Sequence, residues 1–401
     1  MTDHWRESGL ATLTGRADGP ALKPPHPTVP VARRCASQMR AVGGGELIAD
    51  PAVLLTERAA FRGHTRNGRI SVGGTCRLMR AVDGWVAVSC ARPSDADLVA
   101  AVTGAPAETS PWETLETWCS TRKAEEIVAR TGLLGLAASR LGERAPTRLD
   151  ERALTSPLPD PRMDGRDLTG SLVVDFSALW AGPLCAHLLQ LAGAAVVKVE
   201  TPTRPDGARR GHRGFYDLLH AGQRSVVLDP ERSSELRDLQ SLVRRADVVI
   251  EASRPRALAR WGLDADSAAG SGTIWVSITA YGRACDRVGF GDDVAAAAGL
   301  VAWDPETREP VFCGDAIADP LTGLYAAHQA MSALARRRGA LLDIAMVDVA
   351  RWAASPSWRS QAKPVENAPG LPAPRTAPGI ASESGEDTEV VLSELGIRQC
   401  S

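Results

Sequence analysis

The sequence has little net charge, no long apolar run and no paired cysteine motif, and each absence excludes a class of protein. Its 401 residues carry 46 basic and 48 acidic side chains, a net charge of −2. That balance gives no indication of nucleic acid or an anionic membrane as a partner. No apolar run approaches the ~18–20 residues that a membrane-spanning helix needs. The N-terminal residues MTDHWRESG do not have the pattern of a signal peptide, so we expect a cytoplasmic protein.

Metal and nucleotide motifs are also absent from the sequence. The eight cysteines are scattered without a C-x-x-C pair, which is typical of reduced thiols in a cytosolic protein. The seven histidines are dispersed and form no H-E-x-x-H motif, so we predict no metal site. The first strand–helix turn carries neither the G-x-G-x-x-G nor the P-loop fingerprint, and no G-x-S-x-G elbow occurs. These absences argue against a dinucleotide oxidoreductase, an NTPase and a serine hydrolase of that type.

The clearest pattern lies between residues 168 and 200. It opens with the apolar run LVVDF, which is too short for a helix and rich in β-branched residues, so it predicts a buried strand. Pro183 suits the first position of the helix that follows, and a second apolar run ends at Glu200. Such a strand–helix–strand unit implies two parallel strands with a right-handed crossover. Ligands of such sheets bind beyond the carboxyl ends of the strands, which places Trp180 near a ligand.

Strands and helices alternate from residue 168 to residue 353, and this order predicts an α/β fold. We expect a Rossmann-like parallel sheet with helices on both faces over 168–353. Residues 46–145 contain the hairpin dipeptide Asp83-Gly84 and several helical segments, and they predict a smaller α+β domain. Proline-rich composition predicts three further parts: an extended arm over 1–45, a linker over 146–167, and an extended tail with a short helix over 354–401.

Asp319 is the candidate nucleophile. It directly precedes an apolar helix predicted over 321–336, at the N-cap, where a carboxylate meets free backbone N–H groups. An ionised carboxylate there can attack an acyl carbonyl and form a mixed anhydride. The alternative is that Asp319 is a helix cap without a chemical role. Asp315, four residues earlier, is the competing nucleophile.

Several segments, in this order, resemble the class III CoA-transferases of the CaiB/BaiF type. The segments are DFSALWAGPLCAHLLQLAGAAVVKVE, RSVVLDPE, ADVVIEASRPRALARWGLD, ITAYG and GDAIADPLTGLYAAHQAMSALARRRG. That family includes formyl-CoA, carnitine-CoA and bile-acid-CoA transferases, and α-methylacyl-CoA racemase is a relative. The resemblance covers about residues 168–350. It implies coenzyme A, bound as acyl-CoA, as the cofactor, a carboxylic acid as second substrate, no metal, and a homodimer.

The resemblance also implies roles for individual residues. The family nucleophile falls on Asp319, the CoA contacts after the first strand on Trp180 and Ala181, the adenine and ribose contacts on Thr201, Leu228 and Ala252, and a phosphate contact on Arg260. Arg260 has an alternative as a solvated helix charge. Thr201 stands where the family often has a basic residue, so its phosphate contacts are expected to differ.

The chain departs from the family pattern in three places. Asp292-Asp293 occupies the position of a histidine–aspartate pair in the racemases, which makes racemisation the less favoured chemistry, and at least one of the two is expected only to stabilise a helix N-terminus. The segment that resembles the small domain precedes the sheet domain, and we expect it to pack against that domain. The glycine-rich active-site loop of formyl-CoA transferase has no counterpart. We therefore predict a CoA-transferase, with an acyl-CoA racemase or a catalytically weak CoA-binding protein as alternatives.

Overall fold

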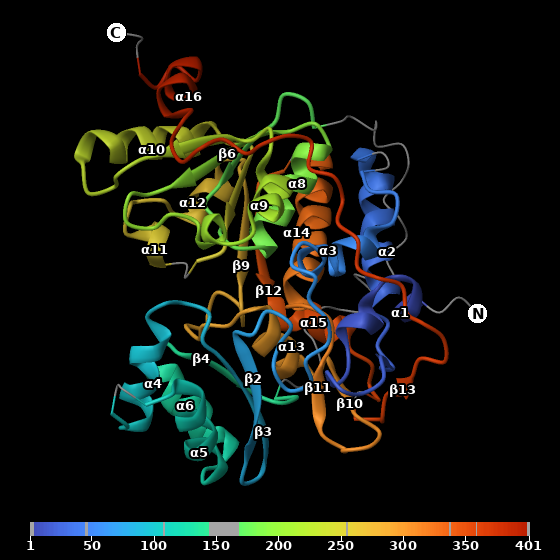
Figure 1. The fold of residues 1–401 in the computed structure, drawn as a ribbon. Coiled ribbons are helices and arrows are strands. Elements are labelled where there is room, and N and C mark those ends of the chain that lie inside the picture. The colour runs from blue at the N-terminus through green and yellow to red at the C-terminus, as the bar shows by residue number, and fades with distance from the viewer. Residues whose placement is uncertain are drawn as a thin grey trace.

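The computed structural model describes residues 4–44, 47–106, 109–143, 168–253, 256–336, 338–357 and 359–398 (Figure 1). The predicted linker over 146–167 lies outside the described residues. Within the described ranges, no helix combines the length and the apolar character that crossing a bilayer requires. The same ranges contain no group of three or more His, Cys, Asp or Glu side chains that could hold a metal ion.

A six-stranded parallel sheet forms the larger part of the molecule. Its order is β12-β9-β8-β5-β6-β7, and every neighbouring pair is parallel. The strands are β5 (Leu172–Asp175), β6 (Ala195–Glu200), β7 (Arg224–Val227), β8 (Val248–Glu251), β9 (Ile274–Thr279) and β12 (Ala340–Ala345). The order reverses at β5, where the chain first runs outward to β7 and then crosses back to β8. The predicted α/β fold with a parallel sheet is confirmed.

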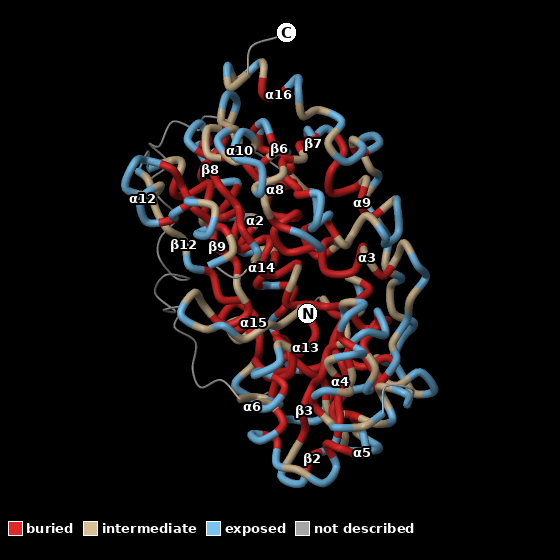
Figure 2. The backbone as a smooth tube through the Cα atoms, turned by 90° about the vertical axis from the view of Figure 1, so that its left-hand side faces the viewer, coloured by how far each residue is buried: buried red, intermediate tan, exposed pale blue. Residues whose placement is uncertain are grey.

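Both faces of this sheet are covered by helices, because successive side chains of each strand enter opposite cores. Val173 packs in one core with Leu184 and Leu321, and Val174 packs in the other with Leu239. Helices α8 (Ala181–Leu191) and α14 (Ala318–Ala335) cover the first face, and α10 (Ser233–Arg245), α12 (Ala265–Gly270) and α16 (Thr388–Glu394) cover the second. Figure 2 shows the continuous buried interior that results.

Further short elements connect these layers. They are α9 (Arg213–His220), α11 (Arg256–Ala259), α13 (Gly291–Ala298), α15 (Met346–Ala353), η4 (Gly207–Arg210) and the antiparallel pair β10 (Val301–Trp303) and β11 (Pro310–Phe312). Of these, α13 begins at Gly291, so that Asp292 and Asp293 lie in its first turn.

A three-stranded antiparallel sheet forms the smaller part. It consists of β2 (Cys76–Ala81), β3 (Gly84–Ser89) and β4 (Ala137–Arg140), and it carries α4 (Asp95–Thr103), α5 (Pro111–Ser120) and α6 (Ala124–Leu134) on one face. The hairpin lies where the sequence predicted it, with Ala81 paired to Gly84. Before β2, a single antiparallel bridge joins Ile70 to Arg77. The small domain boundaries of 46 and 145 stay a prediction.

The other face of the small sheet lies against α13 (Figure 1). Trp85 and Phe312 share an apolar cluster there with Ala296 of α13. Ser89 Oγ donates to Asp293 Oδ1 at 2.7 Å, and Ser139 Oγ donates to the Asp293 carbonyl at 2.7 Å. The segment 76–140 therefore packs against the parallel-sheet part and does not stand apart from it.

The prediction of an extended arm over 1–45 is wrong. Residues in this range form α1 (His4–Glu7), η1 (Leu10–Leu13), the short strand β1 (Leu22–Lys23), α2 (Thr28–Met39) and the irregular turn η2 (Arg40–Gly44). Along α2, buried Val29, Ala32, Cys35 and Met39 recur at helical spacing in the same core as α14. Pro30 lies in the first turn, where a missing N–H breaks no helical bond. η3 (Pro51–Leu55) and α3 (Glu57–Ala60) follow.

The tail has the predicted extended character over most of its length. After β13 (Lys363–Pro364), which pairs with β1, no helix or strand is described until α16 at 388–394. On its way to α16 the tail contacts α1 through Gly370, α3 through Arg375 and α9 through Ala381. Asp387 and Ser225 exchange two hydrogen bonds, of 2.7 and 3.0 Å, so the tail covers the exposed edge strand β7.

Candidate functional site

A cavity of about 800 Å³ lies at the carboxyl ends of β5, β6, β8 and β9. The segments that follow these strands supply most of its wall, and Arg92 and Ser94 of the small sheet part close the opposite side. A ligand is expected at this edge of an open parallel sheet, because the loops after the strands diverge where the strand order reverses. Asp319, at the start of α14, also lines the cavity.

The structure brings four of the seven predicted site residues together in this wall. Asp319, Ala181, Ala252 and Arg260 line the cavity. Trp180, Thr201 and Leu228 are not among its lining residues: Trp180 is 1% exposed beneath the turn, and Leu228 is packed in the core under α10. Thr201 is buried and bridges to Arg204, and Arg204 reaches the cavity where Thr201 does not. A CoA contact by these three residues stays a prediction.

The turn between β5 and α8 forms one wall of the cavity and is under backbone constraint. Leu179 has φ 72°, a left-handed conformation that a leucine rarely adopts. Gly182 packs so closely on Ser177 that a Cβ at this position would collide with that side chain. The helix begins at Ala181, so Pro183 lies at its third position and not at the predicted first; a proline is still tolerated in the first turn.

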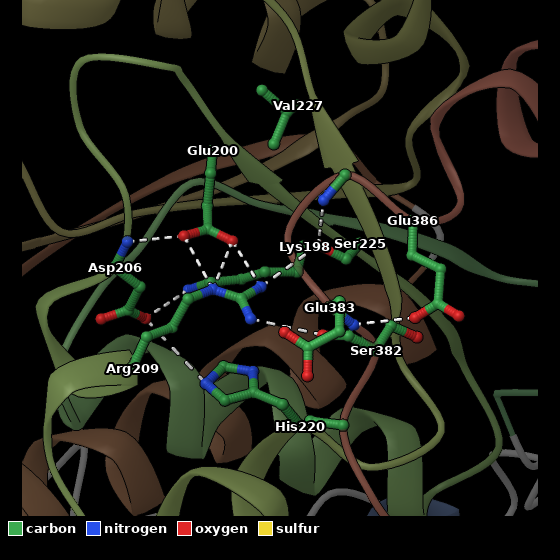
Figure 3. Close-up of polar contacts among 12 residues, drawn as sticks. Lys198, Glu200, Asp206, Arg209, His220, Ser225, Val227, Ser382, Glu383 and Glu386 are labelled. Carbon is green, nitrogen blue, oxygen red and sulfur yellow. Dashed lines mark hydrogen bonds and ion pairs between the residues drawn. The ribbon is translucent and has the colours of Figure 1, made fainter. Parts of the chain in front are cut away.

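A buried charge cluster holds this turn in place, and Figure 3 shows two of its members, Lys198 and Asp206. Lys198 Nζ lies 2.9 Å from Asp206 Oδ2 and 3.4 Å from Asp175 Oδ2, and it also donates to the Ser177 carbonyl. Asp206 Oδ1 in turn accepts the Leu179 N–H at 3.0 Å. The left-handed residue of the cavity wall is therefore fixed by a carboxylate that Lys198 neutralises.

The cluster continues toward the tail through Glu200 and Arg209 (Figure 3). Arg209 Nη2 lies 2.6 Å from Glu200 Oε2, and its Nη1 donates to the carbonyl of Ser382 at 3.3 Å. Burial acts to raise the pKa of Asp206. Lys198 and two backbone N–H groups oppose this effect more strongly, so the pKa falls below its ordinary value, to about 2. Burial together with Lys198 lowers the pKa of His220 to about 3, so this histidine is neutral in the cluster.

Asp319 is the second residue of α14 and not its N-cap as predicted, because the helix begins at Ala318. Its backbone N–H donates to the carbonyl of Ala316 at 2.8 Å, and the residue lines the cavity. Burial raises the pKa of Asp319 to about 7; Arg58 opposes the rise, whereas Asp292 and Asp315 add to it. A carboxyl group poised near neutrality is characteristic of reactive sites.

Asp315, the competing nucleophile, is placed differently. It is 1% exposed, does not line the cavity, and is bound by two guanidinium nitrogens of Arg58, with Arg58 Nε 2.8 Å from Asp315 Oδ2. A carboxylate whose two oxygens are both occupied in this way is a poor nucleophile toward a ligand in the cavity. The geometry therefore favours Asp319 over Asp315.

Asp292 and Asp293 lie in the first turn of α13. Asp293 Oδ1 accepts the backbone N–H of Phe290 at 2.9 Å, which caps the helix, as well as the hydroxyl of Ser89. Asp292 Oδ1 accepts the backbone N–H of Ala316 at 2.9 Å. Burial raises the pKa of Asp292 to about 6 and that of Asp293 to about 7. Neither residue lines the cavity, and the expected helix-capping role holds for Asp293.

The sequence reasoning missed most of the positive charge at the site. Arginines at 92, 204, 256, 260 and 287 line the cavity, and Asp319 is the one acidic residue in its described wall. Arg256 could have been found, because it lies one helical turn before Arg260. Arg92 is more than 200 residues from Asp319 in sequence and carries no local motif. Arg92, Arg256 and Arg287 are also paired with carboxylates outside the lining, at distances of 2.8 to 3.1 Å. Five arginines beside one acidic residue in the wall nevertheless favour a ligand with negative charge.

We predict that Lys198→Met destabilises the protein, because it leaves Asp175 and Asp206 buried without a counter-ion. Removing one partner of a buried ion pair costs roughly 3–5 kcal/mol in the free energy of unfolding. Chemical denaturation should measure this loss, and the exposed Lys123→Met is the control. A loss within 1 kcal/mol, roughly the range of surface ion pairs, would show that the cluster does not hold the turn.

A second prediction concerns Gly291, because a Cβ at this position would collide with Asp319 Oδ2 and with the Ala316 carbonyl. Gly291→Ala should displace the Asp319 carboxylate and lower the free energy of unfolding by about 1–3 kcal/mol, as overpacking does. Gly270→Ala is the matched control, since nothing lies within 4 Å of a Cβ there. The carboxylate can be followed by its reaction with a carbodiimide. Equal reactivity in both variants would mean that Gly291 does not set its position.

The sequence model of CoA-transferase family III matches residues 168–384. Succinate–glutarate CoA-transferase of Agrobacterium fabrum is 30% identical over 205 residues, which cover 45% of this chain and 51% of that protein. Formyl-CoA:oxalate CoA-transferase of Escherichia coli O6:H1 is 27% identical over 201 residues, 45% of this chain and 48% of that protein.

Among solved structures, a CAIB/BAIF family protein from Brucella suis aligns with a TM-score of 0.43 and 30% identity, over 46% of this chain and 54% of that one. The chain spans about half the length of the curated relatives it matches. The family match covers more than half of the 401 residues. The chain belongs to CoA-transferase family III.

Proposed function

We propose that the protein moves CoA from an acyl-CoA thioester to a carboxylic acid through covalent intermediates on Asp319. The observation that carries this proposal is the position of Asp319 as the acidic residue of a cavity otherwise rich in arginine. The named relatives act on CoA esters of small acids, among them succinate, glutarate, formate and oxalate. That agreement supports CoA transfer as the reaction class of this chain.

The reaction consists of four successive nucleophilic displacements at acyl carbonyls. The Asp319 carboxylate attacks the thioester carbonyl and releases the CoA thiolate, which leaves a mixed anhydride. The thiolate attacks the aspartyl carbonyl and expels the donor acid, giving an aspartyl–CoA thioester. The acceptor carboxylate then attacks that thioester, and a second anhydride forms as CoA leaves. CoA finally attacks the acceptor acyl carbonyl and returns Asp319 to its carboxylate.

The arginines in the wall supply charge for the anionic parts of such a ligand. Arg204, Arg256 and Arg260 follow β6 and β8, on the sheet side of the cavity, where we place the phosphates of CoA. Arg92 and Arg287 stand on the opposite side, with Arg287 4.1 Å from the ring of Tyr281. Racemisation needs a second acid–base group at the reacting carbon, and neither member of the Asp292-Asp293 pair lines the cavity. The arrangement therefore favours transfer.

We predict that Asp319→Asn abolishes covalent capture. Succinyl-CoA and hydroxylamine should convert Asp319 of the wild-type protein to a hydroxamate, detected by peptide mass spectrometry, because hydroxylamine attacks the activated aspartyl carbonyl. The variant should form none, and its turnover with glutarate as acceptor should fall by several orders of magnitude. The exposed Asp266→Asn is the control. Turnover within tenfold of wild type would reject Asp319 as the nucleophile.

We also predict that Arg260→Ala weakens CoA binding in a salt-dependent way. A charge-assisted contact to phosphate contributes about 1.5–3 kcal/mol, which is roughly a ten- to hundredfold change in dissociation constant. Calorimetric titration with CoA at low and at high salt measures it, and Arg237→Ala on the exposed side of α10 is the matched control. An unchanged affinity at low salt would leave Arg260 as a solvated helix charge.

A further inference from the structure

Arg58 reaches the start of α14 from a distant part of the chain. It lies on α3, and its guanidinium binds both carboxylate oxygens of Asp315. The guanidinium carbon also lies 4.6 Å from the ring centre of Trp180, so one face of the group stacks on that aromatic ring. A planar ion pair on one edge and a stacked ring on one face leave the guanidinium with a single orientation.

The neighbouring residue fixes α3 itself. Glu57 is fully buried, and Arg375 of the tail binds its two carboxylate oxygens at 2.8 and 3.0 Å. The same guanidinium contacts His187 Nε2 of α8 at 2.9 Å. The tail and α8 therefore hold α3, and α3 presents Arg58 to the site.

Arg58 is the cation of a carboxylate cluster around the nucleophile. Three acidic groups face Asp319 from the elements packed against it: Asp292 and Asp293 from α13, and Asp315 from the turn before α14. Backbone hydrogen bonds join them, since Ala316 donates its N–H to Asp292 and accepts the N–H of Asp319. His64 lies near Arg58 and Asp315, and burial lowers its pKa.

We propose that Arg58 is a positioning residue that keeps Asp319 ionised for attack, by placing the positive charge of this cluster behind the cavity wall. The proposal rests on the proposed function and adds to it a residue that is not among those lining the cavity. Asp315 has the opposite electrostatic effect on Asp319, but it anchors Arg58. The two partners of one ion pair therefore act on the nucleophile with opposite signs, and this separates an electrostatic role from a merely structural one.

The sign of each effect follows from the charges. Burial raises the pKa of Asp319 to about 7, Arg58 lowers it and Asp315 raises it. Loss of the cation in Arg58→Met should move the ionisation midpoint of Asp319 to higher pH. Loss of the anion in Asp315→Asn should move it to lower pH. If the Arg58–Asp315 ion pair had only a structural role, its loss would damage the site in the same way in both variants.

The experiment measures the ionisation of Asp319 directly. Carboxyl ¹³C NMR of protein labelled at aspartate gives its titration midpoint, and Asp319→Asn assigns the resonance. We expect the midpoint to rise by about one pH unit or more in Arg58→Met and to fall in Asp315→Asn. Arg58→Lys, which keeps the charge, should stay nearer to wild type. Arg224→Met and Glu394→Gln, which break an exposed ion pair on β7 and α16, are the matched controls.

A second readout uses chemistry. The rate of hydroxamate formation with succinyl-CoA should follow the same midpoints, so that Arg58→Met loses at least tenfold near pH 6 and recovers most of its rate near pH 9. A structural defect would lower the rate equally at every pH. If Arg58→Met does not fold, the role of Arg58 is tested by the other two variants: the titration midpoint of Asp319 should fall in Asp315→Asn and stay near the wild-type value in Arg58→Lys.

The outcomes separate the two proposals. Midpoints that move in the same direction in Arg58→Met and Asp315→Asn, or that do not move, overturn the role of Arg58. Transfer from succinyl-CoA to glutarate that survives in Asp319→Asn overturns the proposed nucleophile instead, whatever the NMR midpoints of the Arg58 variants.

Discussion

The contact between Arg58 and Asp315 is the interaction on which the site depends. Four carboxylates meet where α13 and α14 begin, and burial there raises the pKa of Asp292, Asp293 and Asp319. One guanidinium, oriented by a carboxylate and an indole ring, is the cation that reaches them. Asp292 and Asp293 are further supported by backbone N–H groups and by Ser89. The packing of these helix ends is compatible with an ionised Asp319 because that cation is present.

Bringing Arg58 to this place requires both ends of the described chain. The N-terminal segment contributes α2, which packs beside α14 in the shared core, and α3, which carries the arginine. The tail contributes Arg375, which binds Glu57. These segments lie far apart in the sequence. Side chains from residues 57 to 375 nevertheless meet within one site, so the order along the chain matters less than the contacts that close it.

The sequence allowed the sheet part and the cavity edge to be predicted, because both depend on local patterns. Runs such as LVVDF are apolar on both faces, and the turn at Trp180-Ala181-Gly182 follows the first of them. The buried helix at 28–39 was missed because the prolines and arginines around it dominate the composition of the first 45 residues. Arg58 and Arg92 could not be found by pattern, since long-range ion pairs leave no spacing to detect. Asp319 as the nucleophile stays a prediction from its motif. It lies inside the helix because α14 begins at Ala318, which the apolar periodicity does not show.

A nucleophilic carboxylate must meet two demands that oppose each other. Removal from water makes it reactive and protects an anhydride from hydrolysis, but it also favours the protonated form, which cannot attack. A free arginine in the cavity would restore the charge, yet it would bind the phosphates or carboxylates of the ligand instead. Arg58 avoids this competition because Asp315 and Trp180 hold it behind the wall. The ion pair has no net charge, but its cation and its anion act separately on a group as near as Asp319. The relative strength of these two opposing effects decides how far the ion pair favours the ionised carboxylate.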